Sequence, residues 1–173
     1  IVLEHFKENS LQGDSILTQI YQDLFGVKTT FLESHQIKLE NINDFVYPKR
    51  ISLNMNDCPD IAQTLCVTAT AFGIPFEISG LSTLKVKETD RLVALQNELQ
   101  KIGCKTEITQ DSIKSIAFHE PDEHIVIKTY NDHRMAMSFA PFALIKDLEI
   151  ENPEVVEKSY PDFWKDFRSV ISL

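Results

Sequence analysis

Short stretches with the residue types of β-strands alternate along this chain with longer stretches of helical periodicity. The expected strands are rich in Val, Ile, Thr and Phe, and they span residues 27–32, 37–39, 50–54, 76–79, 105–109, 125–129 and 148–151. Amphipathic helices are expected at residues 14–25, 58–72, 87–102, 132–145 and 161–171. This alternation predicts an α/β fold. Because no low-complexity linker or charge run divides the chain, we expect one compact unit.

A short pattern at the end of the first expected helix returns 77 residues later. Residues 26–29 read Gly-Val-Lys-Thr, and residues 103–106 read Gly-Cys-Lys-Thr. In both places an apolar helix runs through glycine into a strand. The recurrence predicts a duplicated structural unit that contains a helix and a strand.

Composition excludes several classes of protein. The net charge of -9 argues against a surface that binds nucleic acid or anionic lipid. Neither of the two common glycine-rich phosphate-loop motifs occurs among the 5 glycines, and no apolar run approaches the roughly 18 residues of a membrane span. Cys58, Cys66 and Cys104 lack the spacing of metal ligands, which indicates a reducing compartment and no structural zinc.

The densest group of charges surrounds Lys87 and Arg91, which are four residues apart. In the first turn of a helix over 87–102 they would share one face. Cations are unfavourable at a helix N-terminus, because the helix dipole is positive there, and a bound anion would relieve this. The alternative is that Glu88 and Asp90 neutralise them as surface ion pairs.

A second cation, Arg134, opens the expected helix over 132–145, which is apolar nearly all round and should be buried. Asp132 is expected to cap this helix. A local pair between Asp132 and Arg134 is the alternative role for both. His133 by itself is more often a hydrogen-bonded structural histidine than a catalytic one.

Two further helix beginnings carry Asp60 and Lys158. Asp57 is a plausible cap before Pro59, and Asp60 in a first turn is favoured by the helix dipole alone. Lys158 by default is a surface lysine. If parallel helices present these beginnings together, the four cations form a pocket for a small, multiply charged anion such as a phosphorylated carboxylate.

Taken together, these segments resemble the 5-enolpyruvylshikimate-3-phosphate synthase (EPSP synthase) family. The matching segments occur in the family's order and are Q-G-D at 12–14, P-D at 59–60, K-E-T-D-R-L at 87–92, D-H-R-M-A-M at 132–137 and K-S-Y-P-D-F at 158–163. The resemblance implies two lobes of repeated βαβαββ units around a pseudo-threefold axis, the inside-out α/β barrel of enolpyruvyl transferases. Residues 1–173 then correspond to most of the C-terminal lobe, with the N-terminal lobe absent. The start at Ile1, inside an apolar run and without an initiator Met, agrees with that expectation.

The resemblance also implies an activity. The family transfers the enolpyruvyl group of phosphoenolpyruvate to the 5-hydroxyl of shikimate 3-phosphate and releases phosphate, in the shikimate pathway to chorismate and aromatic amino acids. By this similarity Arg91, Arg134 and Lys158 bind phosphoenolpyruvate.

The remaining implied roles concern shikimate 3-phosphate and the protons. Asp60 and Lys87 contact this substrate, and Asp60 accepts the proton of the attacking hydroxyl. Glu88 transfers a proton at the methylene carbon. The family commonly has Asn where this chain has Thr83, so Thr83 is expected to keep only one hydrogen bond of that contact. Addition across an enol double bond needs a base and an acid, and cations to hold the moving charge, so no metal or organic cofactor is expected.

For the whole protein the resemblance implies a cytoplasmic enzyme, monomeric in its full form, with no nucleic acid or membrane partner. It also implies a target of glyphosate, a herbicide that mimics phosphoenolpyruvate. We expect this chain to be inactive without the N-terminal lobe. Two alternatives stay open: the sister enolpyruvyl transferase that acts on UDP-N-acetylglucosamine, and a non-catalytic anion-binding module. The segments at 87–92 and 132–137 favour the shikimate enzyme.

Overall fold

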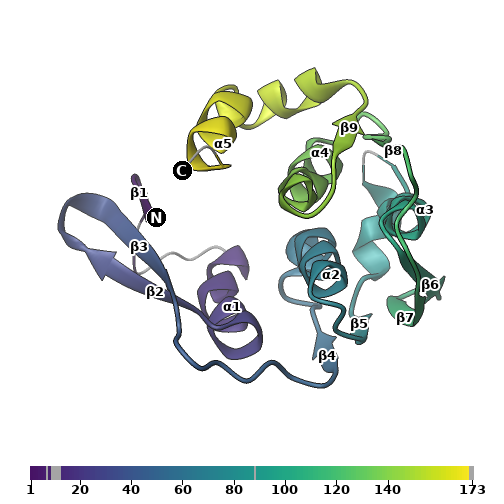
Figure 1. Cartoon of the computed structure of the whole chain (residues 1–173), viewed down its shortest axis with the longest axis horizontal. Helices are drawn as coiled ribbons and strands as arrows, with labels where there is room; N and C mark the ends of the chain where they lie inside the picture. The colour runs from purple at the N-terminus through teal and green to yellow at the C-terminus, as the bar shows by residue number, and fades with distance from the viewer. Residues whose placement is uncertain (7, 9–12, 88, 172–173) are drawn as a thin grey trace. The chain divides into compact units, whose positions relative to one another are not determined.

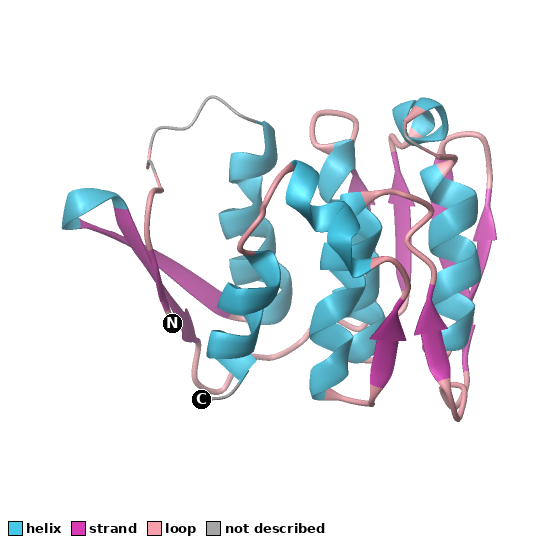
Figure 2. Ribbon diagram, turned by 90° about the horizontal axis from the view of Figure 1, so that it is seen from above, coloured by secondary structure: helices cyan, strands magenta, loops and turns pink. Residues whose placement is uncertain are grey.

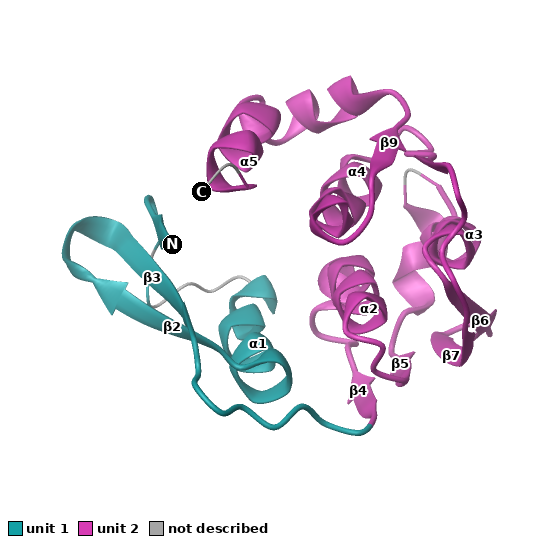
Figure 3. Cartoon of the chain, viewed as in Figure 1, with its two compact units in different colours: residues 1–49 teal, residues 50–173 magenta. Residues whose placement is uncertain are grey.

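The computed structural model describes residues 1–6, 8, 13–87 and 89–171, with helices and strands close to the expected positions (Figure 1). Its contacts divide the chain into two compact units, residues 1–49 and 50–173 (Figure 3). The expectation of one compact unit is therefore wrong. The units are joined by residues 42–50, which form neither helix nor strand. Their composition is ordinary, so it does not identify them as a linker. That both units belong to one lobe stays a prediction.

Unit 1 contains a three-stranded antiparallel sheet, in the order β1-β3-β2, and one α-helix. Its elements are β1 (Val2–Leu3), the 3-10 helix η1 (Gly13–Ile16), α1 (Leu17–Phe25), β2 (Val27–Leu32), the 3-10 helix η2 (Glu33–His35) and β3 (Gln36–Asn41). Gly26 ends α1, and β2 begins at the next residue, as the sequence pattern predicts.

The first part of unit 2 is a complete βαβαββ repeat. Its main elements are β4 (Ile51–Asn54), α2 (Ala62–Ala71), β5 (Phe76–Ser79), α3 (Arg91–Lys101), β6 (Cys104–Ile108) and β7 (Ser112–Phe118). The 3-10 helices η3 (Pro59–Ile61) and η4 (Ser82–Val86) precede α2 and α3. The sheet has the order β4-β5-β7-β6, with only the first pair parallel, and α2 and α3 contact it. Figure 2 shows helices running alongside the strands. The repeat confirms the fold class expected from the resemblance.

The rest of unit 2 starts a second copy of this repeat. Its elements are β8 (Ile125–Ile127), α4 (His133–Phe139), the 3-10 helix η5 (Ala140–Leu144), β9 (Leu148–Ile150), the 3-10 helix η6 (Pro153–Lys158) and α5 (Phe163–Ile171). Strands β8 and β9 pair in parallel across α4, as β4 and β5 do across α2. The order β1-β3-β2 in unit 1 likewise matches β5-β7-β6 in unit 2. The 77-residue recurrence therefore marks a true structural repeat.

Two local expectations differ from the structure. Strand β7 was not predicted, because it contains Ser115 and Ala117, which favour strands only weakly. Ile113 and Ser115 are nevertheless buried in it. Asp57 is not a helix cap, and no side chain caps η3. The N-cap position of η3 is held by Cys58, and Pro59, two positions after Asp57, has no N–H to donate.

Helices α2 and α4 pack against each other in the core of unit 2 (Figure 1). The hydroxyls of Thr64 on α2 and Ser138 on α4 lie 3.0 Å apart. Most side chains of α2 are buried and small or apolar, which allows α4 to approach closely. The beginnings of both helices carry residues of the candidate site. Among the described residues, no helix combines the length and the apolar character needed to cross a membrane.

Candidate active site

The carboxylate of Asp60 lies where three basic side chains meet. Lys87 Nζ is 3.2 Å from Asp60 Oδ1, and Arg91 Nη1 donates to the same oxygen at 2.9 Å. Arg134 Nη2 is 3.4 Å from Oδ2, and Arg134 Nη1 donates to the main-chain oxygen of Asp60 at 3.0 Å. These side chains come from separate segments of unit 2, so the beginnings of α2, α3 and α4 lie together, which is the condition that the predicted anion pocket requires.

Arg91 also forms a buried ion pair that the sequence analysis missed. Arg91 Nε donates to Asp132 Oδ2 at 2.5 Å, and Nη2 donates to Oδ1 at 3.3 Å. The two side chains are only 2% and 0% exposed. Asp132 caps α4 as predicted, by accepting the backbone N–H of Arg134 at 2.9 Å. Its carboxylate, however, pairs with the Arg91 guanidinium. The Arg134 guanidinium contacts Asp60, and the expected ion pair between Asp132 and Arg134 is not seen among the described residues.

Helix α3 begins at Arg91 and not at Lys87, which corrects one expectation. The Asp90 carboxylate accepts the N–H groups of Leu92 and Val93 at 3.1 and 3.2 Å and so acts as the N-cap. An N-cap residue has non-helical backbone angles, so the residues before it lie outside the helix. Lys87 therefore reaches Asp60 from the segment before α3, and Asp90 is engaged with the backbone. Glu88 lies outside the described residues, as does Gln12 of the Q-G-D segment.

The other predicted site residues lie at or beyond the edge of this cluster. Lys158 is the last residue of η6, and its Nζ donates to the main-chain oxygen of Asn131 at 3.4 Å, next to Asp132. Thr83 is exposed on η4 and makes no side-chain hydrogen bond with any other described residue. His133 is half-buried, with Nδ1 4.0 Å from Asp132 Oδ1.

Among the described residues, the cluster holds more positive than negative charge. Lys87, Arg91 and Arg134 face two carboxylates, those of Asp60 and Asp132. Burial acts to raise the pKa of Asp60, but the hydrogen bond from Lys87 and the charges of Arg134, Lys87 and Arg91 outweigh it and lower that pKa below its ordinary value. Asp60 is therefore an anion at neutral pH. Its carboxylate occupies a position to which another anion would be drawn.

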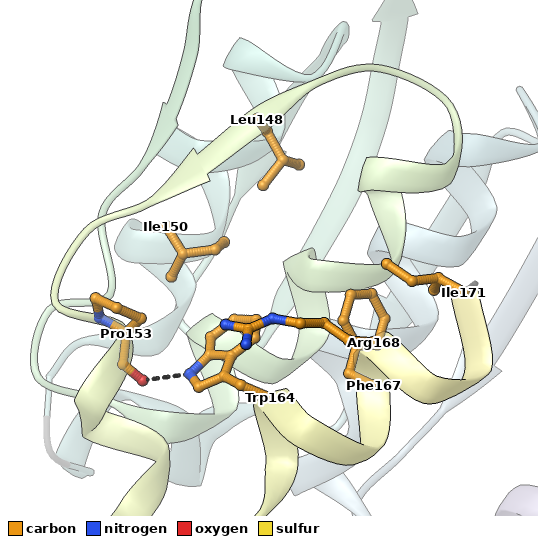
Figure 4. A pocket seen from close by; sticks show the side chains of 7 residues that line it. All are labelled: Leu148, Ile150, Pro153, Trp164, Phe167, Arg168 and Ile171. Carbon is orange, nitrogen blue, oxygen red and sulfur yellow. Dashed lines mark hydrogen bonds between the residues drawn. The ribbon is translucent and has the colours of Figure 1, made fainter.

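An open pocket elsewhere in unit 2 has a different character (Figure 4). It lies between β9, the start of η6 and α5, and it is lined by Leu148, Ile150, Pro153, Trp164, Phe167, Arg168 and Ile171. The Trp164 indole N–H donates to the main-chain oxygen of Pro153 at 2.8 Å. The lining is mostly apolar and contains none of the predicted site residues, so this pocket does not suit a multiply charged anion.

The metal-binding residue types are scattered. Among the described residues, no group of three or more His, Cys, Asp or Glu side chains is arranged to hold a metal ion. The three cysteines, Cys58, Cys66 and Cys104, are buried, and none forms a disulfide with another described residue. Burial raises the pKa of the Cys66 thiol far above its ordinary value, which leaves it protonated.

Comparisons of sequence connect this geometry with a family. The sequence model of the family described as EPSP synthase (3-phosphoshikimate 1-carboxyvinyltransferase) matches residues 1–167. A 3-phosphoshikimate 1-carboxyvinyltransferase from Bacteroides fragilis is 42% identical over 163 residues, which cover 92% of this chain and 39% of the relative. A protein of the same name from Methanospirillum hungatei is 36% identical over 162 residues, covering 93% of this chain and 36% of the relative.

A solved structure agrees at the level of the fold. The EPSP synthase from Acinetobacter baumannii superposes with a TM-score of 0.65 and covers 94% of this chain and 39% of that one, at 23% sequence identity. The chain thus spans about 39% of the length of the Bacteroides fragilis relative and of this structure. Because the family's sequence model extends over nearly all of its residues, the chain belongs to the EPSP synthase family.

Proposed function

We propose that the protein transfers the enolpyruvyl group of phosphoenolpyruvate to the 5-hydroxyl of shikimate 3-phosphate and releases phosphate. The observation that carries this proposal is the contact of Lys87, Arg91 and Arg134 with the single carboxylate of Asp60. A base that lies among cations suits a reaction in which a hydroxyl loses a proton beside two anionic groups. Membership of the EPSP synthase family supports the same reaction.

In this proposal the cations hold the charged groups of both substrates. Arg91, Arg134 and Lys158 bind the carboxylate and phosphate of phosphoenolpyruvate, for which guanidinium groups supply paired N–H donors. Lys87, with Thr83 as a further contact, binds shikimate 3-phosphate.

The carboxylates move the protons. Asp60 accepts the proton of the 5-hydroxyl as its oxygen bonds to the central carbon of phosphoenolpyruvate, and Glu88 delivers a proton to the methylene carbon. Glu88 then takes a proton back from the resulting methyl group as the carbon–oxygen bond to phosphate breaks, which restores the double bond and releases phosphate. Side chains perform each of these steps, and the proposal assigns none to a cofactor.

The lowered pKa of Asp60 has a consequence for this mechanism. A carboxylate held by a Lys87 hydrogen bond and by nearby guanidinium charges is a weak base. The anionic groups of phosphoenolpyruvate compete with Asp60 for Arg91 and Arg134. Binding of that substrate therefore loosens their hold on Asp60 and raises its pKa at the step where a base is needed.

The experiment measures phosphate release by the complete protein, the product of the whole reading frame that contains this chain, with both substrates present. Asp60→Asn and Glu88→Gln should each reduce turnover by about a hundredfold or more. Asp57→Asn is the matched control, because Asp57 is an exposed carboxylate whose hydrogen bond comes from its neighbour Asn56. Unchanged turnover in both site variants would contradict the roles given to Asp60 and Glu88. Absence of phosphate release by the unsubstituted protein would indicate a non-catalytic anion-binding module, and turnover of UDP-N-acetylglucosamine would indicate the sister enzyme.

The proposal includes the setting expected for such an enzyme. We place the protein in the cytoplasm, which the reduced state of its three cysteines supports, and we propose that the complete enzyme is monomeric. Glyphosate, as a mimic of phosphoenolpyruvate, would compete for Arg91, Arg134 and Lys158.

A further inference from the structure

A second buried carboxylate, Glu98, lies two helical turns after Arg91 on α3. Its side chain is only 1% exposed and accepts three hydrogen bonds. The Tyr130 hydroxyl donates to Oε1 at 2.8 Å, while Lys101 Nζ at 2.6 Å and the Lys128 N–H at 3.0 Å donate to Oε2. A carboxylate is unfavourable in the interior unless it is fully paired, and these three hydrogen bonds supply the pairing.

The hydroxyl that reaches Glu98 belongs to an unusual turn. Tyr130 and Asn131 both have left-handed backbone angles, with φ of 55° and 58°. Asparagine adopts such angles readily, but for a tyrosine they cost free energy and persist only when the surroundings hold the residue there. Burial and the hydrogen bond to Glu98 raise the pKa of Tyr130, so its hydroxyl stays protonated and remains the donor.

Two side chains of α3 hold the turn, one on each side of Asn131. Glu98 accepts from Tyr130, and Arg91 donates to Asp132. Because Arg91 and Glu98 are seven residues apart, they lie on the same face of α3. One rigid helix face therefore fixes both ends of this short segment.

The same turn contacts the basic residues that are assigned to phosphoenolpyruvate. Asp132 pairs with Arg91 and accepts the backbone N–H of Arg134, and the main-chain oxygen of Asn131 accepts from Lys158 Nζ. The three residues assigned to phosphoenolpyruvate all contact residues 131–132, Arg91 and Lys158 through their side chains and Arg134 through its backbone N–H. The residues assigned to shikimate 3-phosphate that precede α3, Thr83 and Lys87, make no recorded contact with the turn in the described part of the chain.

We propose that Glu98, acting through the Tyr130 hydroxyl, is a positioning residue for the phosphoenolpyruvate half of the site. This inference rests on the proposed function. Loss of the hydrogen bond lets the left-handed turn relax, and Arg91, Arg134 and Lys158 then shift relative to one another. Binding of the substrate that needs all three suffers, whereas binding of shikimate 3-phosphate through Lys87 is preserved.

The test uses Tyr130→Phe in the complete protein, which removes one hydroxyl and keeps the aromatic ring. The KM for phosphoenolpyruvate should rise about tenfold, the loss expected for one hydrogen bond to a charged group, while the KM for shikimate 3-phosphate stays within about twofold. Glu98→Gln should shift the two constants in the same unequal way. It serves as the second variant if Tyr130→Phe fails to fold.

Ser115→Ala is the control for a general loss of stability. It removes the buried hydroxyl that accepts the Phe76 N–H at 2.8 Å within the sheet of the same unit. Ser115→Ala should lower the melting temperature by about as much as Tyr130→Phe does, and it should leave the ratio of the two KM values unchanged. An equal change of both constants in Tyr130→Phe, or no change in either, overturns the inference alone. Absence of turnover in the unsubstituted protein overturns the proposed function and this inference with it.

Discussion

Arg91 and Asp132 form an ion pair in the interior, with side chains 2% and 0% exposed, whereas Arg50 and Glu77 pair at the surface with side chains about half exposed. Removing one partner of a buried pair leaves an uncompensated charge and costs about 3–5 kcal/mol, against about 0–1 kcal/mol for a surface pair. Asp132→Ala should therefore lower the free energy of unfolding by about 3 kcal/mol or more, and Glu77→Ala by less than about 1 kcal/mol. Urea unfolding measures both, and equal losses would contradict the argument.

The charge of Asp60 should also contribute to stability in a pH-dependent way. The pKa of Asp60 is lowered from 3.8 by its basic neighbours, even though burial opposes this. A carboxylate with a lowered folded-state pKa stabilises the protein above its unfolded-state pKa, and this contribution disappears as the pH falls through the folded-state value.

We therefore expect the stability difference between the unsubstituted chain and Asp60→Asn to be largest near neutral pH and to shrink below about pH 4. The measurement is urea unfolding of both chains between about pH 6 and about pH 2. A difference that stays constant across this range would show that the ionised form of Asp60 adds nothing to stability.

At the residue scale, the sequence identified charges but not their partners. Asp60, Lys87, Arg91 and Arg134 stood out because each is a charge near the start of an expected helix. That Arg91 pairs with Asp132, 41 residues further on, depends on how α3 and α4 pack, which local patterns do not contain. For Glu98, one feature of the sequence could have indicated a buried, paired carboxylate. It is a charge within the apolar stripe of Leu95 and Leu99, where an unpaired carboxylate would be strongly disfavoured.

At the scale of elements, the site residues Asp60 and Lys87 follow two connections, one after β4 and one after β5. Gly80 allows these two connections to approach each other closely. Gly80 lies between β5 and η4, on the path to Lys87, and has a φ of 78°. A Cβ there would lie 2.4 Å from the backbone nitrogen of Asn56, in the connection that leads to Asp60. Backbone cannot move aside as a flexible side chain can, so only glycine fits.

Gly80→Ala should destabilise the chain by about 3 kcal/mol or more, because it adds a steric clash to the strain of left-handed backbone angles. Gly73→Ala is the matched control. Gly73 also has a positive φ, 64°, but a Cβ there meets nothing within 4 Å. It should lose only about 1–2 kcal/mol. Thermal and urea unfolding of both variants separate the clash from the strain, and equal losses would show that the connections adapt.

The repeat was predictable from a few residues because its signal is local. A helix that ends at glycine and passes directly into a strand occurs at Gly26 and again at Gly103, and in both places an antiparallel pair of strands follows. The start of α3 was displaced by four residues because Asp90 competes with Lys87 as the point where the helix can begin. Side-chain capping by Asp90 decides between them.

At the scale of the whole molecule, the residues of the cluster around Asp60 and the Arg91–Asp132 pair all lie in unit 2. In the described part of unit 1, the buried apolar side chains are those of Phe25 and Ile37. The boundary between the units could not be predicted, because the joining segment is short and has no unusual composition. Nor does a sequence pattern show which parts of an α/β repeat pack into one core and which do not.

The charge of the site sets a requirement that this chain does not meet by itself. The two proposed substrates, phosphoenolpyruvate and shikimate 3-phosphate, each carry a carboxylate and a phosphate, together about five to six negative charges at neutral pH. Among the residues assigned to the site or paired with it, Lys87, Arg91, Arg134 and Lys158 are cations and Asp60, Glu88 and Asp132 are carboxylates, a net formal charge of +1. Holding both substrates in one closed site therefore needs further cations, since uncompensated charge away from water is strongly unfavourable.

We predict that the 173-residue chain alone releases no phosphate from the two substrates and binds each of them weakly. Addition of the part of the Bacteroides fragilis relative that this chain does not match should supply the missing cations and restore turnover. The measurement is phosphate release by each part and by the mixture. The mixture with Asp60→Asn serves as control, because it keeps the assembly and removes the proposed base. Turnover by the chain alone would show that its own cations suffice, and an inactive mixture of two folded parts that bind each other would show that charge is not the missing component.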